Sequence, residues 1–359
     1  MAKQKRGTRS FHFDAPPILT AWASVAGKKE SEGPLQAYFD YTNGDTYFGE
    51  KTWEKAECHM QEIALETLLQ KAGKKQKDVD LVFSGDLLNQ CISSSFSLRN
   101  TGLPALGLYG ACSTMAESLL LASMAVSGGF ADRAVAMTSS HFASSERQYR
   151  YPLGYGGQRT PTAQWTVTGS GAALVCSKGD GPVVEAATVG TIVDLGITDA
   201  NNMGAAMAPS AFETIRAHFD DLGAAPEDFD LIVTGDLGKV GKEILVDQFH
   251  QIGVNLGDRY TDCGVLVFDL EGQDVHAGGS GCGCSAIVLC GYLLPGQAPP
   301  DPVLRHRRAA LSHLFSAGRV HPRRLSRRIH LHGKEVSNYG ILAGISGGWH
   351  SLPDWPDPH

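Results

Sequence analysis

The 359-residue chain is long enough for two domains or for one large duplicated unit with a substantial apolar core. Its formal net charge of −7 argues against nucleic acid as a partner. The eight cysteines are scattered and do not form a disulfide framework, and the basic N-terminal residues are not followed by the apolar stretch of a secretory signal. No apolar run approaches the ~18 residues of a membrane span. The sequence therefore predicts a chain without signal peptide or transmembrane segment, in a reducing compartment.

The first part of the chain alternates helical and strand-like patterns. Residues 1–50 mix glycine, proline and aromatic residues, with a strand-like run at Ile18–Val25. Trp53–Leu69 has the apolar spacing of a helix, and the polar loop Gly73–Lys77 follows it. The apolar run Asp80–Asp86 ends in Gly-Asp and is typical of a buried strand. This alternation predicts an α/β fold.

The stretch Leu106–Gly129 contains a tight Gly-Ala-Cys-Ser corner followed at once by an apolar helix. Ser113 or Thr114 can cap this helix. Cys112 is therefore expected at the N-terminal end of a buried helix, where backbone N–H groups and the helix dipole favour negative charge. Three interpretations stay open: Cys112 is a thiolate nucleophile, it belongs to an anion-binding corner, or it is a small buried residue without chemistry.

An internal repeat links the two halves of the chain. Asp228–Leu237 matches Asp78–Leu87 at six of ten positions, and the two segments lie 150 residues apart. Phe212–Ile215 corresponds in the same way to Leu65–Leu68. We therefore predict one α/β unit that is used twice.

The repeat breaks down near the C-terminus. Gly281–Ser285 opens an apolar run that corresponds to the Cys112 corner and its helix, and the repeat then predicts another apolar strand. Instead, Pro302–Lys334 holds eight arginines, one lysine and no acidic residue. We hypothesise a frameshifted tail, because codons for His-Arg-Arg can encode Thr-Gly-Ala one base over. The alternatives are a genuine basic arm and a disordered extension.

Several motifs together resemble the thiolase-like fold, and more closely the stage V sporulation protein AD (SpoVAD) family. The matching runs extend from about residue 10 to residue 293, and the tail beyond residue 294 departs from the pattern. They are Gly85–Gln90, Tyr109–Thr114, Thr138–His141, Glu146–Pro152, Tyr155–Gln158, Thr166–Ala172, Asp194–Asp199, Met203–Pro209 and Ala277–Ala286.

The resemblance implies a duplicated α/β unit in an α-β-α-β-α arrangement. Residues 1–180 would form the first thiolase-like half with Cys112, residues 181–294 the second half, and residues 295–359 an atypical basic tail. Members of this family bind dipicolinic acid (pyridine-2,6-dicarboxylate), with or without calcium, for uptake into and release from bacterial spores. The implied partners are the SpoVA membrane channel proteins, with a peripheral location at the inner spore membrane of the forespore and spore. A homodimer is expected by analogy, and no cofactor or metal site is expected.

Thiolase-like enzymes also need a histidine from the second half, which activates the thioester carbonyl. The repeat places such a group after Thr234-Gly-Asp236, where no histidine follows. We therefore predict a binding protein without catalytic residues. Two alternatives stay open: an acyltransferase or condensing enzyme with Cys112 as nucleophile, and a scaffold with a vestigial pocket.

A small planar dianion needs several short donors and a positive helix end. We assign the ligand pocket to the Cys112 corner and to polar residues that follow neighbouring strands. His141 would carry positive charge near pH 6–7, and Asp86 can instead cap the turn that follows it. The predicted ligand-binding residues are Asp86, Asn89, Cys112, Ser113, Ser140 and His141.

Overall fold

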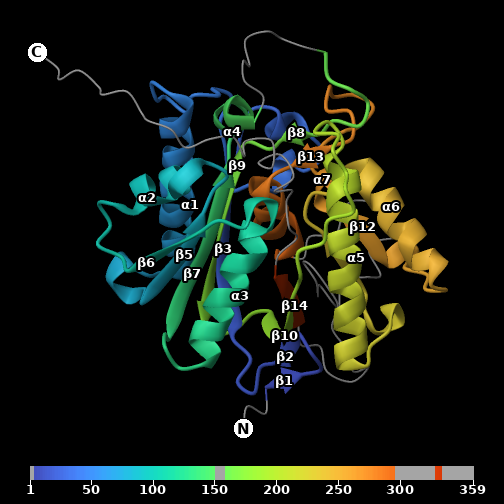
Figure 1. The fold of residues 1–359 in the computed structure, drawn as a ribbon. Helices are drawn as coiled ribbons and strands as arrows, with labels where there is room; N and C mark the ends of the chain where they lie inside the picture. Colours follow the sequence, from blue (N-terminus) through green and yellow to red (C-terminus); the bar gives the residue numbers. More distant parts are fainter. Residues whose placement is uncertain (1–3, 150–157, 296–327, 334–359) are drawn as a thin grey trace, which may run out of the picture.

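The computed structural model describes residues 4–149, 158–295 and 328–333, and its main feature is a ten-stranded mixed sheet (Figure 1). The strand order is β1-β2-β10-β3-β9-β7-β5-β6, with β14 paired to β10 and β4 paired to β3. These strands are β1 (Lys5–Arg6), β2 (Ser10–His12), β3 (Ile18–Ala26), β4 (Tyr41–Thr42), β5 (Leu81–Gly85), β6 (Ala105–Leu108), β7 (Arg133–Ser140), β9 (Gly169–Cys176), β10 (Val183–Val189) and β14 (Arg328–Gly333). Two small sheets pair β11 (Ile232–Thr234) with β12 (Tyr260–Asp262) and β8 (Trp165–Thr166) with β13 (Gly279–Ser280).

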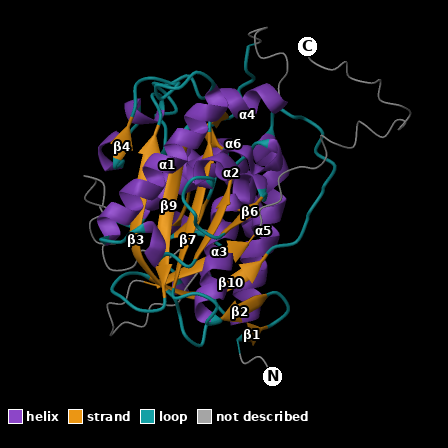
Figure 2. Cartoon of the chain, turned by 90° about the vertical axis from the view of Figure 1, so that its left-hand side faces the viewer, coloured by secondary structure: helices purple, strands orange, loops and turns teal. Residues whose placement is uncertain are grey.

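Helices cover both faces of the first-half sheet. Figure 2 shows α1 and α2 in front of the strands, and Figure 1 places α3 on the opposite face with α5 and α6 further out. The helices are α1 (Trp53–Ala72), α2 (Ile92–Leu98), α3 (Thr114–Ser127), α4 (Phe142–Tyr149), α5 (Met203–Leu222), α6 (Gly238–Gln251), α7 (Cys263–Leu266) and α8 (Cys282–Ile287), which continues as a π-helix over Val288–Leu293. All eight residues of β9 are buried, as expected for a strand covered on both faces.

Helix α8 packs directly on β9 at a glycine. A Cβ atom on Gly171 would lie 2.5 Å from the Ala286 carbonyl oxygen, so a larger residue would push the helix off the sheet. The contact between α8 and β9 therefore depends on the absence of a side chain at Gly171.

The predicted repeat is confirmed by details of both halves. Helices α1 and α5 each end at a left-handed glycine with φ 61°, Gly73 and Gly223. A 3-10 turn follows each glycine, and its aspartate accepts a backbone N–H three residues earlier, at 2.8 Å for Asp78 and 3.0 Å for Asp228. Strands β5 and β11 come next and both lead into Gly-Asp. An α/β duplication is therefore present in the chain.

The two halves differ in their sheets. The repeat equates β10 with β3 and β11 with β5. In the first-half sheet, β9 and β7 lie between β3 and β5, so their counterparts should lie between β10 and β11 in a second-half sheet. Within the described ranges, β11 pairs with β12 alone, and β10 belongs to the large sheet. The division of the chain near residue 180 stays a prediction.

The tail contributes one described strand. β14 pairs with β10 in parallel, whereas its counterpart position in the first half is held by β9, antiparallel to β3. The sequence predicted no regular element here; the exposed edge of β10 offers unpaired backbone groups that any extended segment can satisfy. The frameshift, basic-arm and disorder hypotheses otherwise fall on residues 296–327 and 334–359, outside the described residues.

Candidate functional site

The corner before α3 is built by hydrogen bonds among its own residues. Cys112 is buried in the 3-10 turn Ala111–Ser113, directly before α3. Ser113 Oγ donates to the Gly110 carbonyl at 2.8 Å, and Thr114 Oγ1 donates to the Ala111 carbonyl at 2.7 Å. The predicted position of Cys112 at a helix N-terminus is confirmed. The predicted cap is wrong, because the Ser113 and Thr114 hydroxyls turn back to the preceding turn.

Left-handed backbone conformations cluster around this corner. Ala111 has φ 50°, and Gln90 and Cys91 have φ 64° and 51°. Cys91 Sγ donates to the Leu108 carbonyl at 3.2 Å, which ties the Gln90–Cys91 turn to the end of β6. Such conformations cost roughly 1–3 kcal/mol each and tend to occur at functional sites. The backbone strain therefore marks this end of the sheet as the candidate site.

A carboxyl group from the second half meets Cys112. Asp236 is fully buried, and its Oδ2 accepts from Gly281 N at 2.7 Å and from Ser280 Oγ at 3.4 Å. Burial raises the pKa of Asp236, and the Cys112 thiol, which donates to this carboxyl, is the largest opposing influence. The structure thus joins the first-half cysteine to a second-half acid.

This contact changes the electrostatics expected for the corner. A carboxylate beside a thiol disfavours the thiolate form. In the described part of the chain, the groups that shift the pKa of Asp236 are hydrogen-bond donors, and none is a lysine, arginine or histidine. The positive potential of the α3 N-terminus is therefore offset by a buried acid.

A second buried acid holds the neighbouring loop. Asp262 Oδ2 accepts from Leu237 N at 2.8 Å and from Thr234 Oγ1 at 2.7 Å. Its Oδ1 accepts from Gly238 N and Gly264 N, each at 2.9 Å. Burial, helped by the charge of Asp236, raises the pKa of Asp262 to about 7. Three of the four donors, from Thr234, Leu237 and Gly238, flank Asp236 in the sequence, and the fourth belongs to α7, so Asp262 fixes the position of Asp236.

Ser140 and His141 are used within the protein. Ser140 Oγ donates to the Val167 carbonyl at 2.6 Å and accepts from Gly283 N at 3.1 Å, which joins the end of β7 to α8. His141 Nδ1 accepts from Ala143 N at 3.2 Å, so Nε2 carries the proton and donates to the Thr46 carbonyl at 2.8 Å.

The expected positive charge on His141 is wrong. Burial lowers its pKa below the usual 6.5, with a weaker opposing effect of the Thr46 carbonyl. The ring is therefore neutral near pH 7, and both of its nitrogens are occupied. Its role in ligand binding stays an untested prediction, and its contacts favour a structural one.

Asp86 and Asn89 form hydrogen bonds with other residues of the first half. Asp86 accepts from Leu88 N at 2.9 Å, Ser94 N at 2.8 Å and Ser94 Oγ at 2.7 Å, so it holds the turn before α2. The backbone N–H of Asn89 donates to Gln148 Oε1 at 3.2 Å. Among the six predicted residues, Cys112 influences the pKa of a second-half carboxyl, that of Asp236. Ligand contacts for all six remain predictions.

Sequence reasoning missed a residue that contacts Asp236 and an aromatic stack next to it in the sequence. Gln164 Nε2 donates to the Asp236 carbonyl at 2.7 Å. The next residue, Trp165, stacks on Phe142 at 3.8 Å between ring centroids, with Lys29 Nζ 4.0 Å and the Arg159 guanidinium 4.8 Å from its ring. The repeat aligns Asp236 with Asp86, and this alignment is the sequence feature that could have identified Asp236 as a site residue. Nothing in the sequence pattern pointed to the aromatic and cationic stack.

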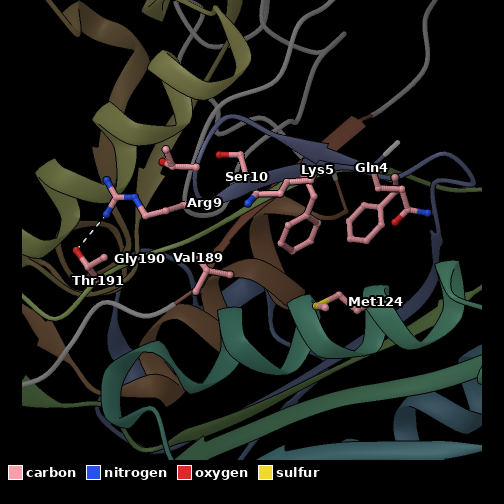
Figure 3. A pocket seen from close by; sticks show the side chains of 11 residues that line it. Gln4, Lys5, Arg9, Ser10, Met124, Val189, Gly190 and Thr191 are labelled. Carbon is pink, nitrogen blue, oxygen red and sulfur yellow. Dashed lines mark hydrogen bonds between the residues drawn. The ribbon is translucent and has the colours of Figure 1, made fainter. Parts of the chain in front are cut away.

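A separate cavity of about 610 Å³ lies at the other end of α3 (Figure 3). Lys5 and Gln4 lie on one side of it and Met124 of α3 on the other. Met124 follows Cys112 by twelve residues, which is about 18 Å along a helix. This cavity is therefore distinct from the Cys112 corner.

Comparison with known proteins agrees with this architecture. The sequence model of the family "Stage V sporulation protein AD (SpoVAD)" matches residues 7–298. The chain is also 45% identical over 287 residues to stage V sporulation protein AD of Bacillus subtilis (strain 168), covering 80% of this chain and 85% of that protein. The chain belongs to the SpoVAD family. It is thus a member of a sporulation protein family.

Solved structures confirm the thiolase-like fold. OleA from Xanthomonas campestris, in a cerulenin-bound crystal structure, is 15% identical to this chain with a TM-score of 0.51. The match covers 77% of this chain and 87% of the OleA chain. The 3-oxoacyl-(acyl carrier protein) synthase III FabH from Xanthomonas oryzae pv. oryzae is 15% identical to this chain with a TM-score of 0.50. The match covers 80% of this chain and 90% of the FabH chain. Similarity at this level establishes the fold of a SpoVAD-family chain and not its activity. In the part of the chain that the structure describes, no helix is long and apolar enough to cross a membrane.

Proposed function

We propose that this SpoVAD-family chain binds dipicolinate at the Cys112 corner without transforming it, for dipicolinate uptake into and release from spores. The observation that carries the proposal is the pairing of the Cys112 thiol with Asp236. A condensing enzyme needs the thiolate form of this thiol as its nucleophile, which a neighbouring cation stabilises and a neighbouring carboxylate disfavours. A buried carboxyl in that place supports a binding role.

The same pairing suggests how a dianion is accepted beside an acid. Because burial raises the pKa of Asp236, its protonated form is populated at higher pH than for an exposed aspartate. A protonated carboxyl can donate a hydrogen bond to a ligand carboxylate. The positive end of the α3 dipole also favours an anion at this corner. The aromatic and cationic stack around Trp165 suits a planar aromatic anion.

Calorimetry with dipicolinate tests the assignment through two variants. We expect Cys112→Ala to weaken binding about fivefold, since the thiol hydrogen bond that orients Asp236 is lost. We expect His141→Ala to lower the free energy of unfolding by about 1–3 kcal/mol, because two buried hydrogen bonds are lost, with a smaller effect on affinity.

The matched control is Cys58→Ala, which removes a half-buried thiol on α1. Absence of heat with the unmodified chain would refute dipicolinate binding, and an equal loss of affinity in Cys58→Ala would show that the pocket lies elsewhere. Incubation with acyl-CoA followed by intact mass measurement tests the enzyme alternative. Acylation that disappears in Cys112→Ala would replace the binding proposal with that alternative.

The proposed homodimer would form at β6, the terminal strand in the order of the large sheet. Leu106 is 52% exposed on β6, and Phe96 on α2 is 50% exposed. Apolar side chains at an open sheet edge favour pairing with another strand. We expect Leu106→Lys to convert a dimer to a monomer in light scattering, with little change in melting temperature.

The control for this surface is Phe130→Lys, which adds a charge at an 83% exposed site after α3. It should leave the dimer intact. A monomeric unmodified chain at 100 µM, or equal dissociation of both variants, would refute the proposed interface. The peripheral location at the inner spore membrane and the SpoVA channel partners remain part of the proposal.

A further inference from the structure

A second cavity with a different chemical character lies at the other end of the first-half sheet. It measures about 460 Å³ and is lined by the end of α1, the start of β7, the end of β9 and the loop that follows β9. Arg133 begins β7 and Ser140 ends it, so the cavity and the candidate site are separated by the length of this strand, about 23 Å. Neither the repeat nor the Cys112 corner accounts for it.

Cationic side chains from three segments converge on this cavity. Lys71 and Lys74 come from the end of α1, Arg133 from β7 and Lys178 from the loop after β9. The lining contains two acidic residues, Asp132 and Asp180, so its formal charge is positive on a chain whose net charge is −7.

Part of the charge is used in contacts within the protein. Lys71 Nζ pairs with Asp40 Oδ1 at 2.8 Å, and Asp132 Oδ1 accepts from Ser177 Oγ at 3.2 Å. The Arg133 Nε–H donates to the Asp78 carbonyl, which fixes the guanidinium at the cavity. Lys74 and Lys178 make no salt bridge within the described residues. Positive charge is therefore available to a ligand from a fixed arginine and two exposed lysines.

The potential of these groups reaches the floor of the cavity. Burial raises the pKa of the Cys176 thiol, Thr20, Arg133 and Lys74 act in the opposite direction, and the charge of Asp80 adds a smaller increase. Cys176 is paired in register with Arg133 across β7 and β9, and its Sγ lies 3.2 Å from Thr20 Oγ1. The floor is thus polar and lies within the field of the cations.

The loop that closes the cavity is firmly seated. Gly179 and Gly181 have φ 143° and 155°, conformations that side-chain-bearing residues rarely adopt. A Cβ on Gly179 would lie 2.6 Å from Thr20 Cγ2, and one on Gly181 would lie 2.0 Å from the Leu19 carbonyl oxygen. Lys178 is therefore presented from a loop whose backbone rests directly on β3, so less entropy is lost when a ligand is bound.

We propose that this cavity binds a phosphate group, either as inorganic phosphate or as a phosphate ester. A planar guanidinium beside ammonium groups is the donor set that recognises phosphate oxygens. The site is independent of dipicolinate binding at Cys112. It gives the chain a second anion site, at the opposite edge of the same sheet.

Calorimetry with inorganic phosphate and glycerol 3-phosphate, using the full chain, tests this proposal. We expect saturable binding that weakens at least tenfold in the double variant Lys74→Ala/Lys178→Ala. The matched control Lys55→Ala/Lys239→Ala removes two exposed lysines elsewhere, with the same change in net charge, and should stay within twofold. Equal weakening in both double variants, or no saturable binding by the unmodified chain, would overturn the proposal.

Vesicle flotation identifies the source of the phosphate. Binding to phosphatidylglycerol vesicles, but not to phosphatidylcholine vesicles, that is lost in Lys74→Ala/Lys178→Ala would assign a lipid headgroup. Binding of the soluble phosphates alone would assign a free ligand. Loss of dipicolinate binding in Lys74→Ala/Lys178→Ala, with normal binding in Cys112→Ala, would contradict both the phosphate assignment and the Cys112 pocket. Loss in Cys112→Ala alone leaves the two sites separate.

Discussion

Asp236→Asn should reduce the pH dependence of dipicolinate affinity, whereas the unmodified chain should bind more weakly as the pH rises. Burial raises the pKa of Asp236, and the ionised carboxylate repels the ligand carboxylates. Both carboxyl groups of the ligand are ionised above about pH 6, so the pH dependence arises from the protein. Above the Asp236 pKa the affinity falls by up to about tenfold per pH unit. An asparagine amide donates a hydrogen bond at every pH and should keep the affinity closer to its low-pH value.

Isothermal titration calorimetry at pH 6, 7 and 8 provides the measurement, with Asp247→Asn as the control. Asp247 is an exposed aspartate on α6, and its replacement makes the same change in net charge. It should keep the pH dependence of the unmodified chain. A flat profile in the unmodified chain, or the same slope in Asp236→Asn, would remove Asp236 from the binding site.

Glu57→Gln should make the chain more stable at pH 8 and flatten its pH dependence of stability. Glu57 is fully buried on α1, and its carboxyl oxygens accept from Ser139 Oγ at 2.9 Å and Ser144 Oγ at 2.8 Å. Burial, followed by the negative charge of Asp86, raises its pKa from 4.5 to about 8. The serine hydroxyls can rotate to accept from a glutamine amide, so the substitution keeps the network.

The direction of the effect follows from proton binding. Between pH 4.5 and about 8 the folded chain keeps a proton on Glu57 that the unfolded chain has released. Stability contributed by this group is complete below pH 4.5 and is lost as the pH rises through 8. Between pH 5.5 and pH 8 the loss is on the order of 2–3 kcal/mol, or about 5 °C in melting temperature. Glu30 and Asp262, each with a pKa raised to about 7, act in the same direction.

Thermal denaturation from pH 5.5 to pH 8, followed by circular dichroism, measures this effect. Glu66→Gln is the control, because Glu66 is exposed on the same helix. It should melt in parallel with the unmodified chain at every pH. If the unmodified chain were instead equally stable at both ends of this range, the buried carboxyls would not titrate as their surroundings indicate.

Much of the architecture could be predicted from local patterns. The Gly-Asp strand ends at Asp86 and Asp236 recur because the same helix, turn and strand are built twice, and this periodicity is visible without coordinates. The position of Cys112 before α3 follows from the small residues of the corner and the apolar run after it. These features depend on residues that are close together in the sequence.

The side-chain roles in the site could not be predicted in the same way. His141 follows a strand, as expected, but its protonation state depends on burial and on the distant Thr46 carbonyl. Ser140 is taken up by Gly283, which lies 143 residues further along the chain. Sequence patterns identify the residue types near a strand end, whereas hydrogen-bond partners from other segments decide which of them remain available.

The sequence by itself determined the duplicated α/β unit, the helix-end cysteine and the family, because each of these is encoded in short contiguous motifs. The tertiary structure alone decided that Asp236 meets Cys112, that His141 is neutral and that cations from three segments share one cavity. The physical reason is that charge and protonation depend on burial and on neighbours in space. These are properties of packing between segments that lie far apart in the chain.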